Sequence, residues 1–390
     1  MEEKKLVPKL RFPGFTEPWE QRKLGEITTY RNGAGHEEKQ SAVGKYEVVN
    51  LNSISIDGGL KPSGKFIDEE TETLIKDDLV MVLSDVGHGD LLGRVAIIPE
   101  NNRFVLNQRV ALLRNNGIAD IKYLFSYINA HQRYFKLQGA GSSQLNISKE
   151  SVETFEVLLP SKDEQKKIGE CFTNLDHLIT LHHRKLEHLK LKKKSLLQKL
   201  FPKEGEVYPE LRFPGFTDPW EQRKLSEVTT CFDNLRVPVT ASDRVPGKIP
   251  YYGANGIQDY VSGHTHSGEF VLIAEDGAND LNDYPIQYVN GAIWVNNHAH
   301  VIAGYKEKLE NKFLSYSLKT VKMSTFIVGG GRSKLNLKAL LEIPISMPNH
   351  DEQCCIGKFI ENIDKNITLH QRKLEHLQLL KKALLQQLFV

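Results

Sequence analysis

Hydrogen-bonding side chains are concentrated in two glycine-containing segments, GAGSSQLNI (139–147) and GGGRSKLNL (329–337). The glycines permit tight turns and a close approach of the backbone to a ligand. The Ser, Gln, Arg, Lys and Asn that follow supply donors and acceptors. Neither segment has the spacing of a phosphate-binding loop. A polar ligand site and a glycine turn that ends a helix therefore both remain open, and we expect the shared Leu-Asn to anchor the segment to the fold.

Histidine and aspartate gather in two other segments, SDVGHGD (84–90) and GHTHSG (263–268). These residue types bind metal ions, but neither segment is joined by third and fourth ligands at a known metal-site spacing. We predict loop or core roles for these side chains and no metal site in this chain.

Motifs for catalysis are missing from the sequence. There is no Walker A sequence, no glycine-rich methyl-donor loop and no N-P-P-Y or D-P-P-F type motif for methyl transfer to an amino group. The G-x-S-x-G and H-E-x-x-H motifs are absent as well. The sequence thus provides no sign of an ATP motor, a methyltransferase, a serine hydrolase or a zinc protease.

Composition describes a soluble globular chain of two or three domains. The 390 residues are 40% hydrophobic and 26% charged, with a formal net charge of +2. No apolar run reaches the roughly 20 residues that span a bilayer, and MEEKKLVPKL at the start has no signal-peptide core. The four cysteines form no C-x-x-C pair, so we expect a reducing cytoplasm. The total charge alone does not predict a nucleic-acid partner.

Two internal repeats organise the chain. LRFPGFTEPWEQRKL (10–24) returns as LRFPGFTDPWEQRKL (211–225) with one difference. A longer segment, 163–201, returns without a gap at 351–389, with 25 of 39 positions identical. Two copies are too few for a solenoid, so we predict tandem units with pseudo-twofold symmetry. Because Pro13, Gly14 and Pro18 disfavour a helix, the short motif is predicted to be a loop pinned by its aromatic residues.

The bodies between these repeats are predicted to be α+β. Alternating apolar runs predict strands at 79–84, 94–99, 109–114, 270–275, 292–297 and 298–304. Apolar residues at helical spacing predict helices at 121–138 and 307–321. The expected domains are a first body at 1–160, a first long helix at 161–201, a second body at 202–348 and a second long helix at 349–390.

Each long helix begins with a recognisable cap. Ser161 with Glu164 forms a capping-box sequence, and Asn349 with Glu352 provides the same arrangement in the second copy. The interior of each helix follows a heptad of apolar residues, which predicts a coiled coil. We expect the two helices to pair with each other, antiparallel, because tandem bodies related by a twofold axis reverse their direction.

One register of this coil brings its polar seam residues together. Pairing Leu186 with Leu377 sets two mixed layers, His182 with Lys381 and Lys193 with His370. A neutral imidazole can accept a hydrogen bond from an ammonium group, so these layers are predicted to set the register. The alternative is that both residue types extend to the coil surface.

The whole chain resembles the specificity subunit of a type I restriction–modification system. LRFPGFTEPWEQRKLGE resembles the start of many such subunits, and PSKDEQKKI and PNHDEQCCI resemble the starts of their central and C-terminal conserved regions. Cys354 and Cys355 are unusual at this place, but the order of body, helix, body and helix matches. The resemblance implies two target-recognition domains, each reading one half of a bipartite, asymmetric DNA site, with the coiled coil as a ruler between them.

The resemblance also implies partners and cofactors. Two modification subunits would bind this chain, hold S-adenosylmethionine and methylate adenine N6, and restriction subunits would use ATP and Mg²⁺. On this reading the chain itself is not an enzyme and holds no cofactor. The alternatives are a protein-binding scaffold with duplicated domains on a coiled-coil strut, and a stand-alone DNA enzyme with an unfamiliar site.

Base readout requires donors and acceptors that reach groove edges. The candidates in the first body are Ser142, Ser143, Gln144 and Asn146, with Asn107, Gln108 and Arg109 as secondary candidates. Those in the second body are Arg332, Ser333, Lys334 and Asn336, with Asn296, Asn297 and His298 as secondary candidates. We expect Arg332 to contact guanine and Gln144 to pair with adenine.

Overall fold

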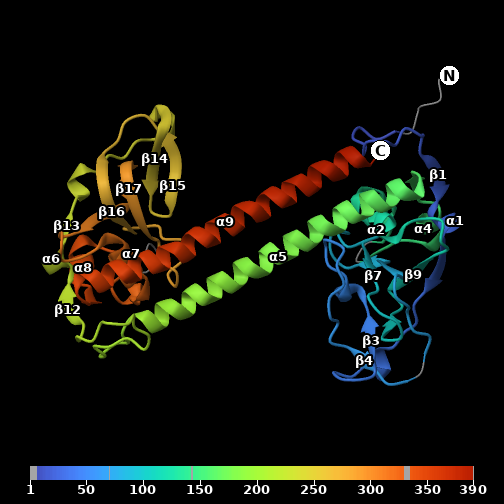
Figure 1. The fold of residues 1–390 in the computed structure, drawn as a ribbon, viewed down its shortest axis with the longest axis horizontal. Helices are drawn as coiled ribbons and strands as arrows, with labels where there is room; N and C mark the ends of the chain where they lie inside the picture. Colours follow the sequence, from blue (N-terminus) through green and yellow to red (C-terminus); the bar gives the residue numbers. More distant parts are fainter. Residues whose placement is uncertain (1–6, 70, 142–143, 329–333, 390) are drawn as a thin grey trace. The chain divides into compact units, whose positions relative to one another are not determined.

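The computed structural model describes residues 7–69, 71–141, 144–328 and 334–389. It divides into two compact units (Figure 1). The first comprises the chain up to His182 together with Lys373 onward, and the second comprises His183–Arg372. Each unit therefore contains one body and a segment of both long helices.

The first body is built on a four-stranded sheet and a three-stranded sheet. The first has the order β2 (Thr28–Asn32), β9 (Val110–Asn115), β5 (Leu79–Val82) and β7 (Val95–Ile97). The second has the order β4 (Phe66–Ile67), β3 (Tyr46–Val49) and β8 (Phe104–Leu106), with β3 and β8 parallel. The strands predicted at 79–84, 94–99 and 109–114 are confirmed.

The helix predicted at 121–138 is two helices, α2 (Ile121–Ala130) and α3 (Gln132–Gln138). The break lies at His131, where φ is −99° and ψ is 33°. The His131 N–H bonds the carbonyl of Ile128, three residues back, so the last turn tightens and the helix ends. The apolar spacing does continue, with Phe135 fully buried, which explains why the pattern predicted one helix.

The second body contains one six-stranded sheet. Its order is β13 (Thr229–Cys231), β18 (Ala299–Gly304), β16 (His266–Ala274), β17 (Ile286–Val295), β14 (Pro246–Gly253) and β15 (Gly256–Val261). Helix α7 (Asn311–Thr320) packs on β16 and β17. The predicted strands and the predicted helix of this body are therefore confirmed, and the chain has the α+β class expected.

The two bodies repeat the same plan despite their divergent sequences. β1 (Glu20–Lys23) pairs with β11 (Glu156–Leu159), and β12 (Glu221–Lys224) pairs with β19 (Pro344–Met347) in the matching register. In each body a strand then runs parallel to a neighbour from earlier in the chain, β8 beside β3 and β17 beside β14. The duplication inferred from the repeats thus extends through both bodies.

The long helices are α5 (Lys162–Leu200) and α9 (His350–Leu388), each within two residues of its predicted ends. In the first unit the rings of Phe172 and Phe389 stack with centroids 5.5 Å apart. In the second unit Leu200 shares a core with Ile360. Within each unit, the start of one long helix therefore packs on the end of the other. No helix in the described ranges carries an apolar stretch long enough to cross a membrane.

The lysines of the heptad seam bond aspartates. Lys381 Nζ lies 2.5 Å from Asp176 Oδ1 in the first unit, and Lys193 Nζ lies 2.6 Å from Asp364 Oδ1 in the second. The two pairs occupy equivalent positions in the repeats. Each ammonium group thus has a carboxylate partner, which is a stronger acceptor than a neutral imidazole. The predicted layers with His182 and His370 stay a prediction. The complete register of the coil stays a prediction.

The repeated short motif joins the two long helices of each unit. Arg11 donates to both carboxylate oxygens of Glu164, at 2.7 and 2.8 Å, and Leu10 N–H bonds the carbonyl of Gln387. In the second unit Arg212 donates to both carboxylate oxygens of Glu352, and Leu211 N–H bonds the carbonyl of Lys199. Each motif thus contacts the start of one long helix and the end of the other. Its first part is irregular, as predicted, but its last residues form β1 and β12, because they pair with β11 and β19, which corrects the prediction of a loop over the whole motif.

This contact corrects the predicted capping boxes. Ser161 and Asn349 do accept from the backbone N–H groups of Glu164 and Glu352. The two glutamate side chains, however, bond arginine and do not turn back to the cap residue. A bidentate, charge-assisted pair in a buried place outweighs one bond to a backbone N–H.

Candidate nucleic-acid interface

The candidate residues of the first body come together from three distant segments. Leu83 N–H bonds the carbonyl of Arg109, and Ile147 N–H bonds the carbonyl of Leu83, both at 3.0 Å. The strand β10 (Leu145–Asn146) also pairs with β6 (Ser84–Asp85). The candidate segments 107–109 and 144–147, which are far apart in the sequence, therefore lie on either side of one short segment.

The second body repeats this arrangement. Glu275 N–H bonds the carbonyl of His298 at 2.9 Å, and Leu335 N–H bonds the carbonyl of Glu275 at 2.7 Å. Lys334 forms a bridge with Asp276. Both bodies thus build the same cluster of three segments, although the residue types differ.

The structural match between the two glycine segments differs from the sequence match by two residues. Ala140 bridges Asn146 in the first body, and Val328 bridges Lys334 in the second. The next helices start after Ser148 and Asn336. Asn146 therefore corresponds to Lys334, and the two Leu-Asn pairs are not equivalent. The backbone pairing, set by the flanking helices and strands, decides the register, so the predicted common anchor is wrong.

Two buried asparagines shape the turns within each cluster. The Oδ1 of Asn107 accepts from the N–H of Arg109 at 3.4 Å, and the Oδ1 of Asn296 accepts from the N–H of His298 at 2.8 Å. Both side chains are 4% exposed. Such buried groups hold a turn and leave the following side chains to meet a ligand.

Several candidates in the first cluster already have partners. Gln108 donates to Glu37 at 3.1 Å, and Gln144 donates to the Oδ1 of Asn146 at 3.0 Å. Asn146 also accepts from Ser84 at 2.5 Å. Among the described residues, no group hydrogen-bonds or pairs with the guanidinium of Arg109, which makes it the best placed cation of this cluster.

The second cluster holds charged candidates. Lys334 is exposed and its Nζ lies 2.9 Å from Glu275, and the Nδ1 of His298 lies 2.6 Å from Asp276. Asn297 is exposed, and Asn336 is the exposed N-cap residue of α8 (Leu337–Leu341). Four candidates, Ser142, Ser143, Arg332 and Ser333, lie outside the described residues.

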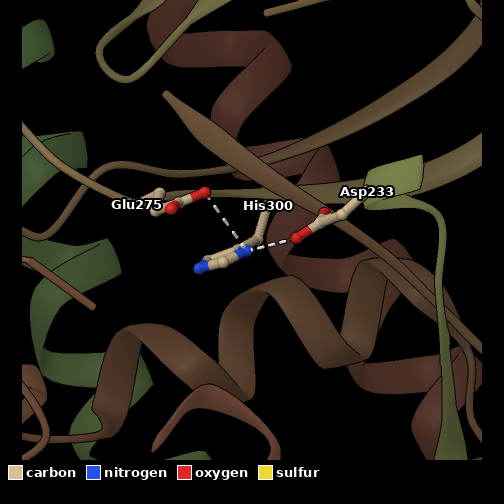
Figure 2. A group of neighbouring side chains, drawn as sticks. All are labelled: Asp233, Glu275 and His300. Carbon is tan, nitrogen blue, oxygen red and sulfur yellow. Dashed lines mark hydrogen bonds and ion pairs between the residues drawn. The ribbon is translucent and has the colours of Figure 1, made fainter. Parts of the chain in front are cut away.

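An ionic network that sequence motifs did not predict joins the second cluster through Glu275, and Figure 2 shows its Asp233, Glu275 and His300 side chains. His300 is 1% exposed and contacts Asp233 Oδ2 through Nδ1 at 2.6 Å and the carbonyl of Leu335 through Nε2 at 2.7 Å. Arg236 lies 2.6 Å from Glu275 and 3.2 Å from Asp233. The residues of this network come from separate strands and turns, so no local sequence spacing could have predicted them.

The hydrogen bonds of this network fit a structural anchor better than a metal centre. Asp233, Glu275 and His300 are, within the described ranges, the one set of such side chains close enough to share an ion. Both ring nitrogens of His300 are already engaged, Nδ1 with Asp233 and Nε2 with the carbonyl of Leu335, so neither is free for a metal ion in this arrangement. Burial opposes ionisation of Asp233, but bonds from His300 and Val301 and the charge of Arg236 outweigh it and lower its pKa.

The segments considered for metal binding have the loop and core roles predicted for them. Asp85 accepts from the backbone N–H groups of Gly87 and Leu91, and Asp90 pairs with Lys136. His266 is 1% exposed and contacts Thr265 and the carbonyl of Phe232, and burial lowers its pKa.

A family model described as the type I restriction modification DNA specificity domain matches residues 16–191 and again residues 217–379. One match falls on each repeat, and together they cover most of the chain. This chain belongs to that family. The resemblance drawn from the repeats is therefore confirmed: this is a specificity subunit of a type I restriction–modification system.

Individual relatives agree with this family assignment. A putative type I restriction enzyme specificity subunit of Haemophilus influenzae is 50% identical over 159 residues, which are 41% of this chain and 40% of that protein. The MjaVIII specificity subunit of Methanocaldococcus jannaschii is 24% identical over 96% of this chain and 92% of its own length. The crystal structure of an S subunit from M. genitalium has the same fold, with a TM-score of 0.74, 18% identity and coverage of 98% of this chain and 99% of that one.

Proposed function

We propose that each body of this specificity subunit reads one half of a bipartite, asymmetric DNA site. The observation that carries the proposal is the pair of equivalent three-segment clusters, one in each body, with different side chains on the same backbone plan. Different side chains on equivalent scaffolds are what two different half-sites require. The first recognition domain is assigned to residues 1–160 and the second to residues 202–348.

The long helices at 161–201 and 349–390 act in this proposal as a spacer of constant length. Their sequences repeat without a gap, with 25 of 39 positions identical, whereas the bodies have diverged, which suits exchangeable readers on a common support. An antiparallel coiled coil, including the polar layers of His182, Lys193, His370 and Lys381, would present the two readers with opposite polarity. The contacts at the helix ends within each unit support this geometry.

Cations and amides of the clusters carry the contacts with DNA. Arg109 and Arg332 are assigned to guanine edges, and Gln144 to adenine, because their donors match those bases in the major groove. Lys334 is assigned to a phosphate, exchanging its bond with Glu275 for one with the backbone. Asn107 and Asn296 shape the turns. The other polar candidates, Ser142, Ser143, Gln108, Ser333, Asn297 and His298, complete the proposed contact surface together with Asn146 and Asn336.

Catalysis belongs to the partners in this proposal. Two modification subunits with S-adenosylmethionine methylate adenine N6, and restriction subunits use ATP and Mg²⁺ to move and cut DNA. The specificity subunit supplies no catalytic residue and works in the cytoplasm. The sequence supports this division of labour, because it contains none of the ATP-binding, methyl-transfer or hydrolytic motifs named above.

Exchange of one body tests the proposal. Residues 226–348 are replaced by the corresponding body of another specificity subunit, and the assembled complex is bound to a library of random duplexes. One half-site should change while the other half and the spacer stay the same. Replacement of residues 25–160 is the matched control and should change the opposite half. A change in both halves, or in neither, would contradict the two-reader model.

The same binding experiment separates the scaffold alternative. Sequence-specific affinity that falls steeply with salt is expected of a DNA reader, since phosphate contacts release counterions. A protein-binding scaffold would show no such affinity in the presence of the modification subunits. Methyl transfer or cleavage by the isolated chain would instead support a stand-alone enzyme.

A further inference from the structure

One equivalent helix position carries a different residue in each unit. Helices α2 and α7 are both ten residues long, and their N-cap residues Asp120 and Glu310 donate a backbone N–H to Gln165 and Gln353 at 2.7 and 2.9 Å. Counting from these matched caps, Ser126 of the first unit corresponds to Tyr316 of the second. A small side chain thus stands where the other unit has a large aromatic one.

In the second unit Tyr316 completes a three-part contact. Its hydroxyl donates to Asp364 Oδ2 at 2.8 Å, while Asp364 Oδ1 receives Lys193 Nζ at 2.6 Å. The same ammonium lies 5.5 Å from the centroid of the Tyr316 ring. Burial and the neighbouring Asp364 carboxylate hold the pKa of Tyr316 far above its usual range, so the phenol stays protonated and donates.

The first unit has the same aspartate and lysine but lacks the ring. Asp176 Oδ1 receives Lys381 Nζ at 2.5 Å. Within the described part of the chain, no donor is bonded to Asp176 Oδ2. A cavity of about 670 Å³ opens beside these groups. Its lining includes Ser126, Asp176 and Lys381 and the apolar side chains of Phe125, Ile179 and Leu385, with the charged side chains of Asp57, Arg94 and Lys382 elsewhere in the wall. Its volume is in the range of small-ligand sites, about 300–1,000 Å³.

We propose that this cavity binds an aromatic ring that carries a hydroxyl group. The hydroxyl donates to Asp176 Oδ2, Lys381 lies over the ring face, and the apolar walls cover the ring edge. This arrangement reproduces, with a ligand, the contact that Tyr316 makes within the second unit. Burial, only partly offset by Lys381, raises the pKa of Asp176, so this carboxylate gains from a further donor. The site is independent of the role proposed for the DNA-contacting clusters.

Titration of the full chain with p-cresol, the side chain of tyrosine, tests this site. Saturation-transfer NMR should show saturable binding, and toluene, which lacks the hydroxyl, should bind at least about tenfold more weakly. Asp176→Asn should weaken p-cresol binding about tenfold, because the acceptor loses its charge. Asp364→Asn, the matched change in the second unit, should leave it unchanged. No binding of p-cresol, or equal binding of toluene, would overturn the proposal.

Filling the cavity provides an independent check. Ser126→Tyr introduces the residue that the second unit carries at this place, so the fold should accept it, and p-cresol binding should be lost. Binding that survives Ser126→Tyr would place p-cresol elsewhere and refute the site. Titration with N-acetyl-tyrosinamide distinguishes two sources of the ligand. If it binds like p-cresol, the site accepts a tyrosine of a polypeptide; if p-cresol alone binds, the site takes free phenols.

Discussion

Removal of Arg11 tests how the repeated motif holds the first unit together. Arg11 meets both carboxylate oxygens of Glu164, whose side chain is 0% exposed, while its own side chain is 12% exposed. Arg11→Leu leaves this carboxylate buried without a counter-charge. Loss of one partner of a buried pair costs about 3–5 kcal/mol, and the partial exposure of Arg11 favours the lower end. We therefore expect about 3 kcal/mol, a change of roughly 100-fold in the unfolding equilibrium.

Urea unfolding and hydrogen exchange measure this loss and locate it. Exchange should rise in the first unit, and Arg212→Leu, whose pair is similarly buried at 14% and 1% exposure, should produce the matching loss in the second unit. The double variant Arg11→Leu with Glu164→Leu should recover most of the stability, because an apolar pair replaces the ionic one. Lys199→Leu removes an exposed pair with Glu210 and should cost far less than Arg11→Leu, because water screens an exposed pair.

Either of two results would contradict the interpretation that the buried Arg11–Glu164 pair stabilises the first unit. A loss for Arg11→Leu no larger than that for Lys199→Leu would mean that the buried pair contributes nothing special. A double variant no more stable than the single variant would mean that the uncompensated carboxylate is not the cause of the loss.

Two further predictions concern the helix pair and the buried network. Lys193→Asp sets two carboxylates together and should lower the melting temperature, and adding Asp364→Lys should restore it; no recovery would argue against the pair. Asp233 and Glu275 have lowered pKa values, despite burial, because of their bonds to His300, Lys334 and Arg236. Their stabilising effect is present above their ordinary values near pH 4 and is lost as pH falls through the lower folded values. Hydrogen exchange in β18 should therefore accelerate only below about pH 4. His300→Ala should shift this onset to higher pH. Acceleration already at about pH 6 in the unchanged chain would show that these two carboxylates do not stabilise β18 in this way.

The sequence by itself determined the elements and their duplication. The repeats at 10–24 and 211–225 and at 163–201 and 351–389 predicted tandem units, and local periodicity placed strands such as β5 and β9 and both long helices. These features depend on side chains that are near one another along the chain, so spacing alone reveals them. Asn107 and Asn296 were predicted only as base-contacting candidates; their bonds to the backbone N–H two residues ahead were not predicted from the sequence.

Only the tertiary structure decided which distant groups meet. Glu164 has a cap residue three positions away, yet it bonds Arg11, 153 residues distant, because folding buries the two together and a bidentate charged pair then prevails. His300 and Asp233 are 67 residues apart, and no pattern in the chain marks them as neighbours. The sequence similarity of the two glycine segments aligned them two residues away from their structural correspondence. That correspondence is set by backbone hydrogen bonds to neighbouring segments. The spacing of nearby side chains thus determines the helices and strands, whereas burial and long-range pairing determine the contacts that form the sites.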